Sequence, residues 1–184
     1  MQIKGLRIPI IFICACLSLA ILTGGQWAYK EFSVERPFIR EIINLNNVEN
    51  VELIGDSDLP KLVIKLGSNA DLASFIAQLR EIVASNYKRQ VELRLIDERN
   101  EELNDVLLTS RFYIYEALVN GNYTEMYFEL EQVLNSLDLD EWDLTMDNQY
   151  IYLKLYQDSA YLYEIIPLNR QMLVIGGDIP YASN

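Results

Sequence analysis

Hydrophobic residues are distributed unevenly along the chain. Residues 8–23 are apolar almost throughout, and the two glycines that follow extend this run to 18 uncharged residues. A run of this length lies toward the short end of the range that spans the hydrocarbon core of a bilayer. The pattern predicts a single transmembrane helix over residues 8–25.

The residues on either side of the apolar run orient it. Basic residues precede it and aromatic residues follow it, namely Lys4 and Arg7 before it and Trp27 and Tyr29 after it. Basic residues favour the cytoplasmic side of a membrane, and Trp and Tyr favour the membrane–water interface. We therefore expect residues 1–7 in the cytoplasm and the C-terminal domain outside.

Two other interpretations of the apolar run stay open. A basic start followed by an apolar stretch is also typical of a cleaved secretory signal, although Gln26-Trp27-Ala28 is a poor cleavage site. Lipid attachment at Cys16 is the other alternative, and it would leave a short apolar core before the modified residue. The sequence favours the uncleaved anchor.

The pattern after the anchor changes to short alternating segments, and residues 30–99 form a first predicted module. Apolar residues at helical spacing predict helices, and period-2 alternation predicts strands. The predicted order is helix, strand, strand, helix, strand, at residues 38–43, 51–53, 62–66, 72–83 and 91–95. This α-β-β-α-β order resembles that of the ring-building modules of secretion and sporulation assemblies. The resemblance rests on element order, and it implies assembly through self-association.

Residues 100–184 form a second predicted module. Two helices are expected first, at residues 103–118 and 126–137, where apolar residues recur at helical spacing. Alternating strands follow, at residues 142–146, 151–155 and 161–166, with a further short strand at 172–175. Together the two modules predict an α+β outside domain of two small β-sheets, each covered by helices on one face.

Charge separates the two modules more sharply than hydropathy does. Residues 1–100 carry 12 basic and 12 acidic residues, whereas residues 101–184 carry 3 basic and 15 acidic ones. The whole net charge of −12 therefore lies in the distal module, and the shift places the module boundary near Asn100. Nucleic-acid binding needs clustered Lys and Arg, so no nucleic-acid partner is expected.

Few residues offer catalytic or metal-binding chemistry. The chain has no histidine, and its two cysteines, Cys14 and Cys16, lie inside the apolar run. The outside domain therefore has neither imidazole nor thiol for a nucleophile pair, a zinc site or a disulfide. No glycine-rich phosphate loop is present either. We expect no cofactor and no metal.

Carboxylates are the remaining reactive groups. The acidic segment from Asp138 to Asp147 lacks the glycine and the final glutamate that an EF-hand calcium loop requires, so it is interpreted as a solvated turn. Glu164 lies between apolar neighbours on a predicted strand, where an edge position explains it as well as catalysis does. No catalytic residue is assigned, and the protein is predicted not to be an enzyme.

Tyrosine supplies the most informative local pattern, because ten of the twelve tyrosines lie between Tyr113 and Tyr181. Alternation places several of them on one face of two neighbouring predicted strands. This candidate interaction face consists of Tyr150, Tyr152, Tyr156, Tyr161 and Tyr163. Tyrosine combines apolar area with a polar tip and is enriched at protein interfaces. Cross-strand aromatic packing within the fold is the alternative explanation.

These features favour a single-pass, extracytoplasmic protein that acts as a non-enzymatic interaction or assembly module of the cell envelope. Its expected partners are the membrane, through the N-terminal helix, and other envelope proteins or further copies of itself. An alternative is a sensor or ligand-binding domain for cations or cationic peptides. A carboxylate-based hydrolase is a third possibility.

Overall fold

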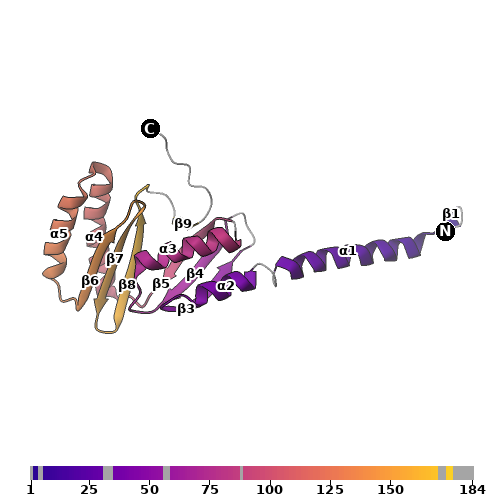
Figure 1. The fold of residues 1–184 in the computed structure, drawn as a ribbon, viewed down its shortest axis with the longest axis horizontal. Coiled ribbons are helices and arrows are strands. Elements are labelled where there is room, and N and C mark those ends of the chain that lie inside the picture. Colours follow the sequence, from indigo (N-terminus) through magenta and orange to yellow (C-terminus); the bar gives the residue numbers. More distant parts are fainter. Residues whose placement is uncertain are drawn as a thin grey trace.

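The computed structural model of the chain describes residues 2–3, 6–30, 35–55, 59–87, 89–169 and 173–175. A long N-terminal helix leads into two small β-sheets with helices packed on them (Figure 1). The prediction of an α+β fold with two small sheets is confirmed.

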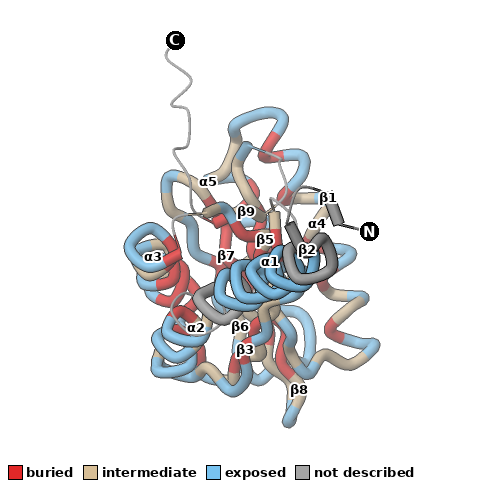
Figure 2. Tube along the Cα trace, turned by 90° about the vertical axis from the view of Figure 1, so that its right-hand side faces the viewer, coloured by how far each residue is buried: buried red, intermediate tan, exposed pale blue. Residues whose placement is uncertain are grey.

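The N-terminal segment forms a short antiparallel pair, β1 (Gln2–Ile3) and β2 (Leu6–Arg7), followed by helix α1 (Ile8–Lys30). The described side chains of α1, from Phe12 to Gln26, are exposed, and Figure 2 shows these turns in the exposed colour. Among the described residues, no helix combines the length and the apolar character needed to span a membrane.

The first module has the predicted α-β-β-α-β order. Its elements are α2 (Arg36–Ile43), β3 (Val48–Ile54), β4 (Lys61–Leu66), α3 (Leu72–Ile82), which continues into a π-helical turn (Val83–Tyr87), and β5 (Val91–Ile96). Strands β3 and β4 pair antiparallel, whereas β4 and β5 pair parallel across the α3 crossover.

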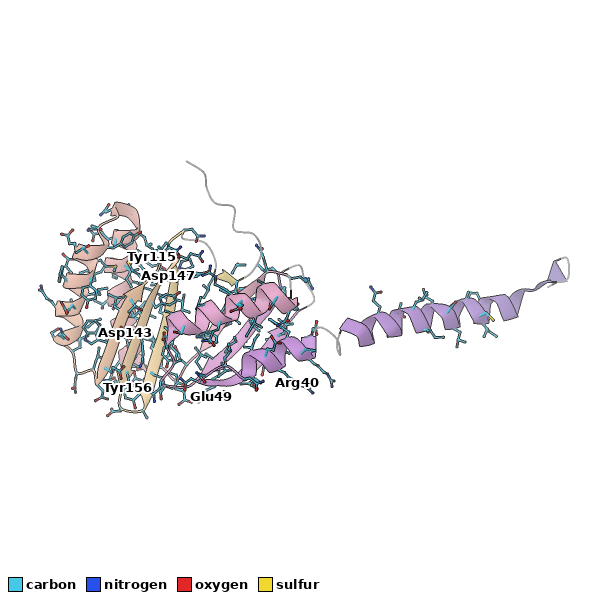
Figure 3. All side chains as sticks on the ribbon, viewed as in Figure 1. Arg40, Glu49, Tyr115, Asp143, Asp147 and Tyr156 are labelled. Atoms are coloured by element: carbon cyan, nitrogen blue, oxygen red, sulfur yellow. The ribbon has the colours of Figure 1, made fainter. Side chains whose placement is uncertain are left out.

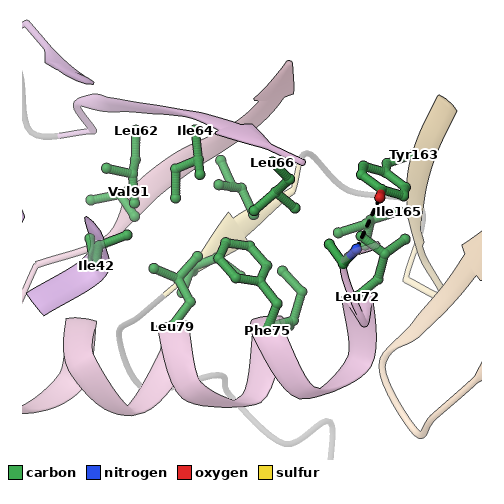
Figure 4. Close-up of a cluster of buried hydrophobic side chains, with 14 of the residues drawn as sticks. Ile42, Leu62, Ile64, Leu66, Leu72, Phe75, Leu79, Val91, Tyr163 and Ile165 are labelled. Atoms are coloured by element: carbon green, nitrogen blue, oxygen red, sulfur yellow. Dashed lines mark hydrogen bonds between the residues drawn. The ribbon is translucent and has the colours of Figure 1, made fainter. Parts of the chain in front are cut away.

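The core of the first module lies between this sheet and the two helices α2 and α3 (Figure 4). Alternate residues of β4 point into it, and Leu62, Ile64 and Leu66 are fully buried. Phe38 of α2 stacks on Tyr87 with ring centroids 4.7 Å apart. The Asp71 side chain accepts a hydrogen bond from the Ser74 amide, which caps the start of α3.

The second module places two helices on one face of the sheet β6-β7-β8. Its elements are α4 (Glu101–Asn120), α5 (Tyr123–Asn135), β6 (Glu141–Met146), β7 (Tyr150–Gln157) and β8 (Ala160–Pro167). The Asn100 side chain caps α4 by accepting from the Leu103 amide, and Gly121 ends the helix in the left-handed conformation that glycine adopts without strain. Residues 151, 153 and 155 of β7 point into the helix-covered core.

The last described strand differs in placement from the sequence expectation. Strand β9 (Val174–Ile175) pairs antiparallel with β5, so it extends the first sheet to the order β3-β4-β5-β9. The sequence placed a short strand at 172–175 in the second module. Period-2 alternation identifies a strand but carries no information on its pairing partner, which here lies in the other module.

Candidate functional site

The five tyrosines of the candidate interaction face do share one face of β7 and β8, as alternation predicts. The structure covers this face with the first module. Tyr150, Tyr152, Tyr161 and Tyr163 are buried members of the first module's core, and the partly buried Tyr156 packs against it. An open partner-binding face is therefore not what these side chains form. They line a junction, which we define as the contact of this face with residues 66–72 and 97–99.

Two phenols of the junction bind the backbone where β4 ends. Tyr161 donates a hydrogen bond to the Leu66 carbonyl at 2.7 Å. Tyr163 donates to the Gly67 carbonyl at 2.6 Å and accepts from the Ala70 amide at 3.1 Å (Figure 4). Leu66 is the last residue of β4, and Gly67 and Ala70 lie between β4 and α3. The tyrosines therefore supply hydrogen-bond partners to backbone groups that the junction buries.

Burial also keeps these phenols protonated. It raises the pKa of Tyr163 to about 12. The pKa of Tyr161 is raised above its ordinary value by burial and by the nearby carboxylates of Glu49 and Glu98. Both hydroxyls therefore remain hydrogen-bond donors over the physiological pH range.

Residues 97–99, which connect the modules, cover the outer edge of β8. The Tyr161 amide donates to the Glu98 carbonyl at 3.1 Å. The Asp97 carboxylate accepts the Tyr163 amide at 2.8 Å and two hydrogen bonds from Arg99 at 2.7 and 2.6 Å. An uncovered strand edge is a template for pairing with other chains, and this connection occupies it from within the molecule.

Asp147 organises the turn at the start of β7. Its carboxylate accepts hydrogen bonds from the amides of Gln149 and Tyr150 and from the Tyr152 hydroxyl, at 2.7, 2.8 and 2.8 Å. Burial opposes ionisation, but these hydrogen bonds and the positive charge of Arg80 outweigh it and hold the pKa of Asp147 below its usual value. Figure 3 shows Asp147 and Tyr156 at opposite ends of β7.

The lowered pKa of Asp147 predicts a pH-dependent contribution to stability. A carboxyl whose pKa is lower in the folded state stabilises the fold above its unfolded pKa and loses this effect as the pH falls through the folded value. Asp147→Asn should therefore lower the melting temperature at pH 7, and the gap to the parent protein should narrow toward about pH 3. Thermal melts across this range check the prediction. The exposed Asp143→Asn is the matched control, and an equal gap at both pH values contradicts the prediction.

The other carboxylates singled out in the sequence have structural partners or lie on the surface. Glu164 accepts a hydrogen bond from Arg111 of α4 at 2.6 Å, which ties β8 to the helix above it. Glu141 pairs with Lys154 at 2.9 Å. Within the part of the chain that the structure describes, no group of three or more acidic, cysteine or histidine side chains is arranged to hold a metal ion.

An exposed apolar stripe on α4 is the surface that sequence reasoning missed. It consists of Leu108, Phe112, Tyr115 and Val119, whose exposed fractions are 54%, 79%, 50% and 67%. The four residues are spaced by four, three and four positions, so they share one side of the helix. We call this the α4 stripe. Single exposed apolar residues are ordinary, but a contiguous set marks a candidate interaction site.

The α4 stripe lies opposite the face that α4 buries. The residues that α4 buries are Leu103, Leu107, Ser110, Ile114, Ala117 and Leu118. Helices α4 and α5 cover the side of the second sheet that is remote from the first module (Figure 1). Figure 3 labels Tyr115 in this helical layer. The stripe is thus separate from the tyrosine junction.

A second apolar period in the same helix could have revealed the α4 stripe. The core period of this helix runs through Leu103, Leu107 and Ile114, and it accounts for the helix prediction by itself. The stripe repeats at the same spacing on the other side, so α4 is apolar on two faces, which a surface helix does not need. Comparisons with protein-family models, with curated proteins and with solved structures found no match for this chain.

Proposed function

We propose that this protein is a membrane-anchored, extracytoplasmic interaction module that binds another envelope protein through the α4 stripe and catalyses no reaction. The observation that carries the proposal is the exposure of four apolar side chains in register on one helix face, at 50–79% each. Exposure of such an apolar face to water is unfavourable. Its burial against a partner would contribute hydrophobic free energy, because folding leaves this area exposed.

The anchor in this proposal is the apolar N-terminal helix. Its sequence has 18 uncharged residues behind a basic start, and large apolar side chains such as Phe12, Leu17 and Leu22 are 62–70% exposed on it. An apolar helix whose described side chains, from Phe12 to Gln26, are all exposed suits a lipid environment. The basic start favours a cytoplasmic N-terminus, which would place both modules outside.

The least exposed carboxylates favour a binding role over a catalytic one. Asp97 and Glu164 are the least exposed carboxylates of the ion pairs among the described residues, at 3% and 17%, and each is held by an arginine. Carboxylates used in acid–base catalysis need access to a substrate, whereas these are committed to contacts between elements.

Site-specific photo-crosslinking in native membranes tests this function. A photoreactive phenylalanine analogue at Tyr115, within the stripe, should give a discrete adduct with another envelope protein, and the same analogue at Phe128 on α5 should not. Phe112→Ser should abolish the Tyr115 adduct, because it removes the most exposed apolar side chain of the stripe. Identical crosslinking from both positions, or an adduct that survives Phe112→Ser, would contradict the proposed function.

A further inference from the structure

The spacing of the α4 stripe specifies the secondary structure that fits against it. Leu108, Phe112, Tyr115 and Val119 alternate steps of four and three, which is the 3.5-residue period of a and d positions in a coiled-coil seam. A second helix with the same period can follow this seam, with its side chains inserted between those of α4. The stripe extends over about 16 Å, or roughly three helical turns. A strand alternates every second residue and would leave this period after one or two contacts.

The charges beside the α4 stripe specify the chemistry of that helix. Exposed acidic residues border it, with Asp105 preceding it and Glu116 adjacent to Tyr115. The basic residue on its other border is Arg111, which is engaged by Glu164 at 2.6 Å. Across the two helices of this layer, residues 101–135 contain seven acidic residues and one basic residue. The stripe therefore lies in a negative field, which attracts cationic and repels anionic partners.

From this combination we propose that the partner presents an amphipathic α-helix with a heptad apolar seam flanked by lysine or arginine. The proposal rests on the proposed function and names the chemistry of its partner. A second copy of α4 has the right period, but an antiparallel copy would bring Glu116 against Glu116, and a parallel copy would place Glu116 opposite Arg111, which Glu164 already engages at 2.6 Å. An anionic membrane surface is disfavoured by the same charges. A heptad apolar seam matches the period of the α4 stripe, and basic flanks opposite Asp105 and Glu116 match its negative field.

Peptide binding to the full-length protein in neutral-lipid nanodiscs tests the proposal. The probe is a fluorescent helical peptide of about three heptads with Leu at a and d and Lys at e and g. Two control peptides are matched to this probe. The first carries Glu at e and g, and the second has the composition of the Lys peptide with its Leu residues moved out of the a and d positions. Fluorescence anisotropy should show binding of the Lys peptide and much weaker binding of both others. Equal binding of the Lys peptide and either of the others overturns the proposal.

Variants on the protein side locate the binding surface. Phe112→Ser with Tyr115→Ser should weaken binding of the Lys peptide roughly 10- to 30-fold. Glu116→Lys should weaken it about fivefold, because it reverses a bordering charge. Phe128→Ser and Glu129→Lys on α5 make the same chemical changes at exposed positions outside the stripe, and both should bind like the parent protein. Equal losses of affinity for the Lys peptide in the α4 and α5 variants would show that binding is not specific to the α4 stripe, which would overturn the proposal.

Sedimentation and vesicle flotation distinguish the other occupants. A dimer that Phe112→Ser breaks and that the Lys peptide fails to displace would assign the stripe to a second copy. Flotation with anionic vesicles that depends on Phe112 would assign it to the membrane. Either result overturns the proposal. A specific Tyr115 adduct in native membranes without binding of the Lys peptide would leave the proposed function standing and remove only the inferred helix chemistry.

Discussion

Replacing Tyr163 with alanine is expected to lower the free energy of unfolding by about 3–5 kcal/mol. Tyr163 is among the largest fully buried side chains, and it belongs to β8 while lying in the core of the first module. Its removal would leave a cavity between the modules and would also remove the partner of the Gly67 carbonyl and the Ala70 amide. Loss of packing and of two buried hydrogen bonds therefore act together.

Urea denaturation of the full-length protein in mild detergent measures this loss. Tyr163→Phe is the matched control, since it keeps the ring and removes only the hydroxyl, and it should lower stability by about 1–2 kcal/mol. Because the junction contributes to the first core and adjoins the second, both modules of the parent protein should unfold in one transition. A change below about 1 kcal/mol for Tyr163→Ala would show that the junction adds little to the fold.

Asp97→Ala is expected to lower the free energy of unfolding by about 2–4 kcal/mol. Its carboxylate is 3% exposed and binds both the Arg99 guanidinium and the Tyr163 amide. The substitution leaves a partly buried cation and an edge amide of β8 without this acceptor. Arg99 retains 29% exposure, so water solvates part of its unpaired charge. The loss of stability should therefore be smaller than for a fully buried ion pair.

The same denaturation experiment measures this second prediction. Asp97→Asn keeps an acceptor for the Tyr163 amide and removes the charge. Its free energy of unfolding should therefore lie between those of the parent protein and Asp97→Ala. Glu141→Ala is the control for an exposed carboxylate, because Glu141 is 58% exposed where it pairs with the 13% exposed Lys154, and it should lower stability by less than Asp97→Ala does. Equal effects of Asp97→Ala and Glu141→Ala would argue against a structural role for the connection between the modules.

Local periodicity predicted most of the elements. The α-β-β-α-β order of the first module and the two helices and three strands of the second each follow from apolar residues at period 3.6 or 2. Alternation also separated the two faces of β7 correctly, with Tyr150 and Tyr152 on one and Leu153 and Leu155 on the other. These features depend on residues close together in the sequence, which is why a sequence reveals them.

The junction depends on contacts that a local pattern does not encode. The same alternation arises whether a tyrosine face meets solvent or another module, because the period reports only which residues share a side. The pairing of β9 with β5 is a long-range choice of the same kind. The α4 stripe is different, since its 4-3-4 spacing is local and visible, but it is superimposed on the stronger core period of the same helix.

The junction also constrains the order in which the chain can fold. The Leu66 and Gly67 carbonyls meet their tyrosine partners 95 and 96 residues later in the sequence. A nascent or translocating chain presents its N-terminal part first, so the first core remains open on one side until β8 has emerged. The first module therefore cannot complete its core on its own during synthesis. Its core closes only after residues up to β8 are available. Until then, apolar residues such as Leu72 and Phe75 stay accessible to chaperones.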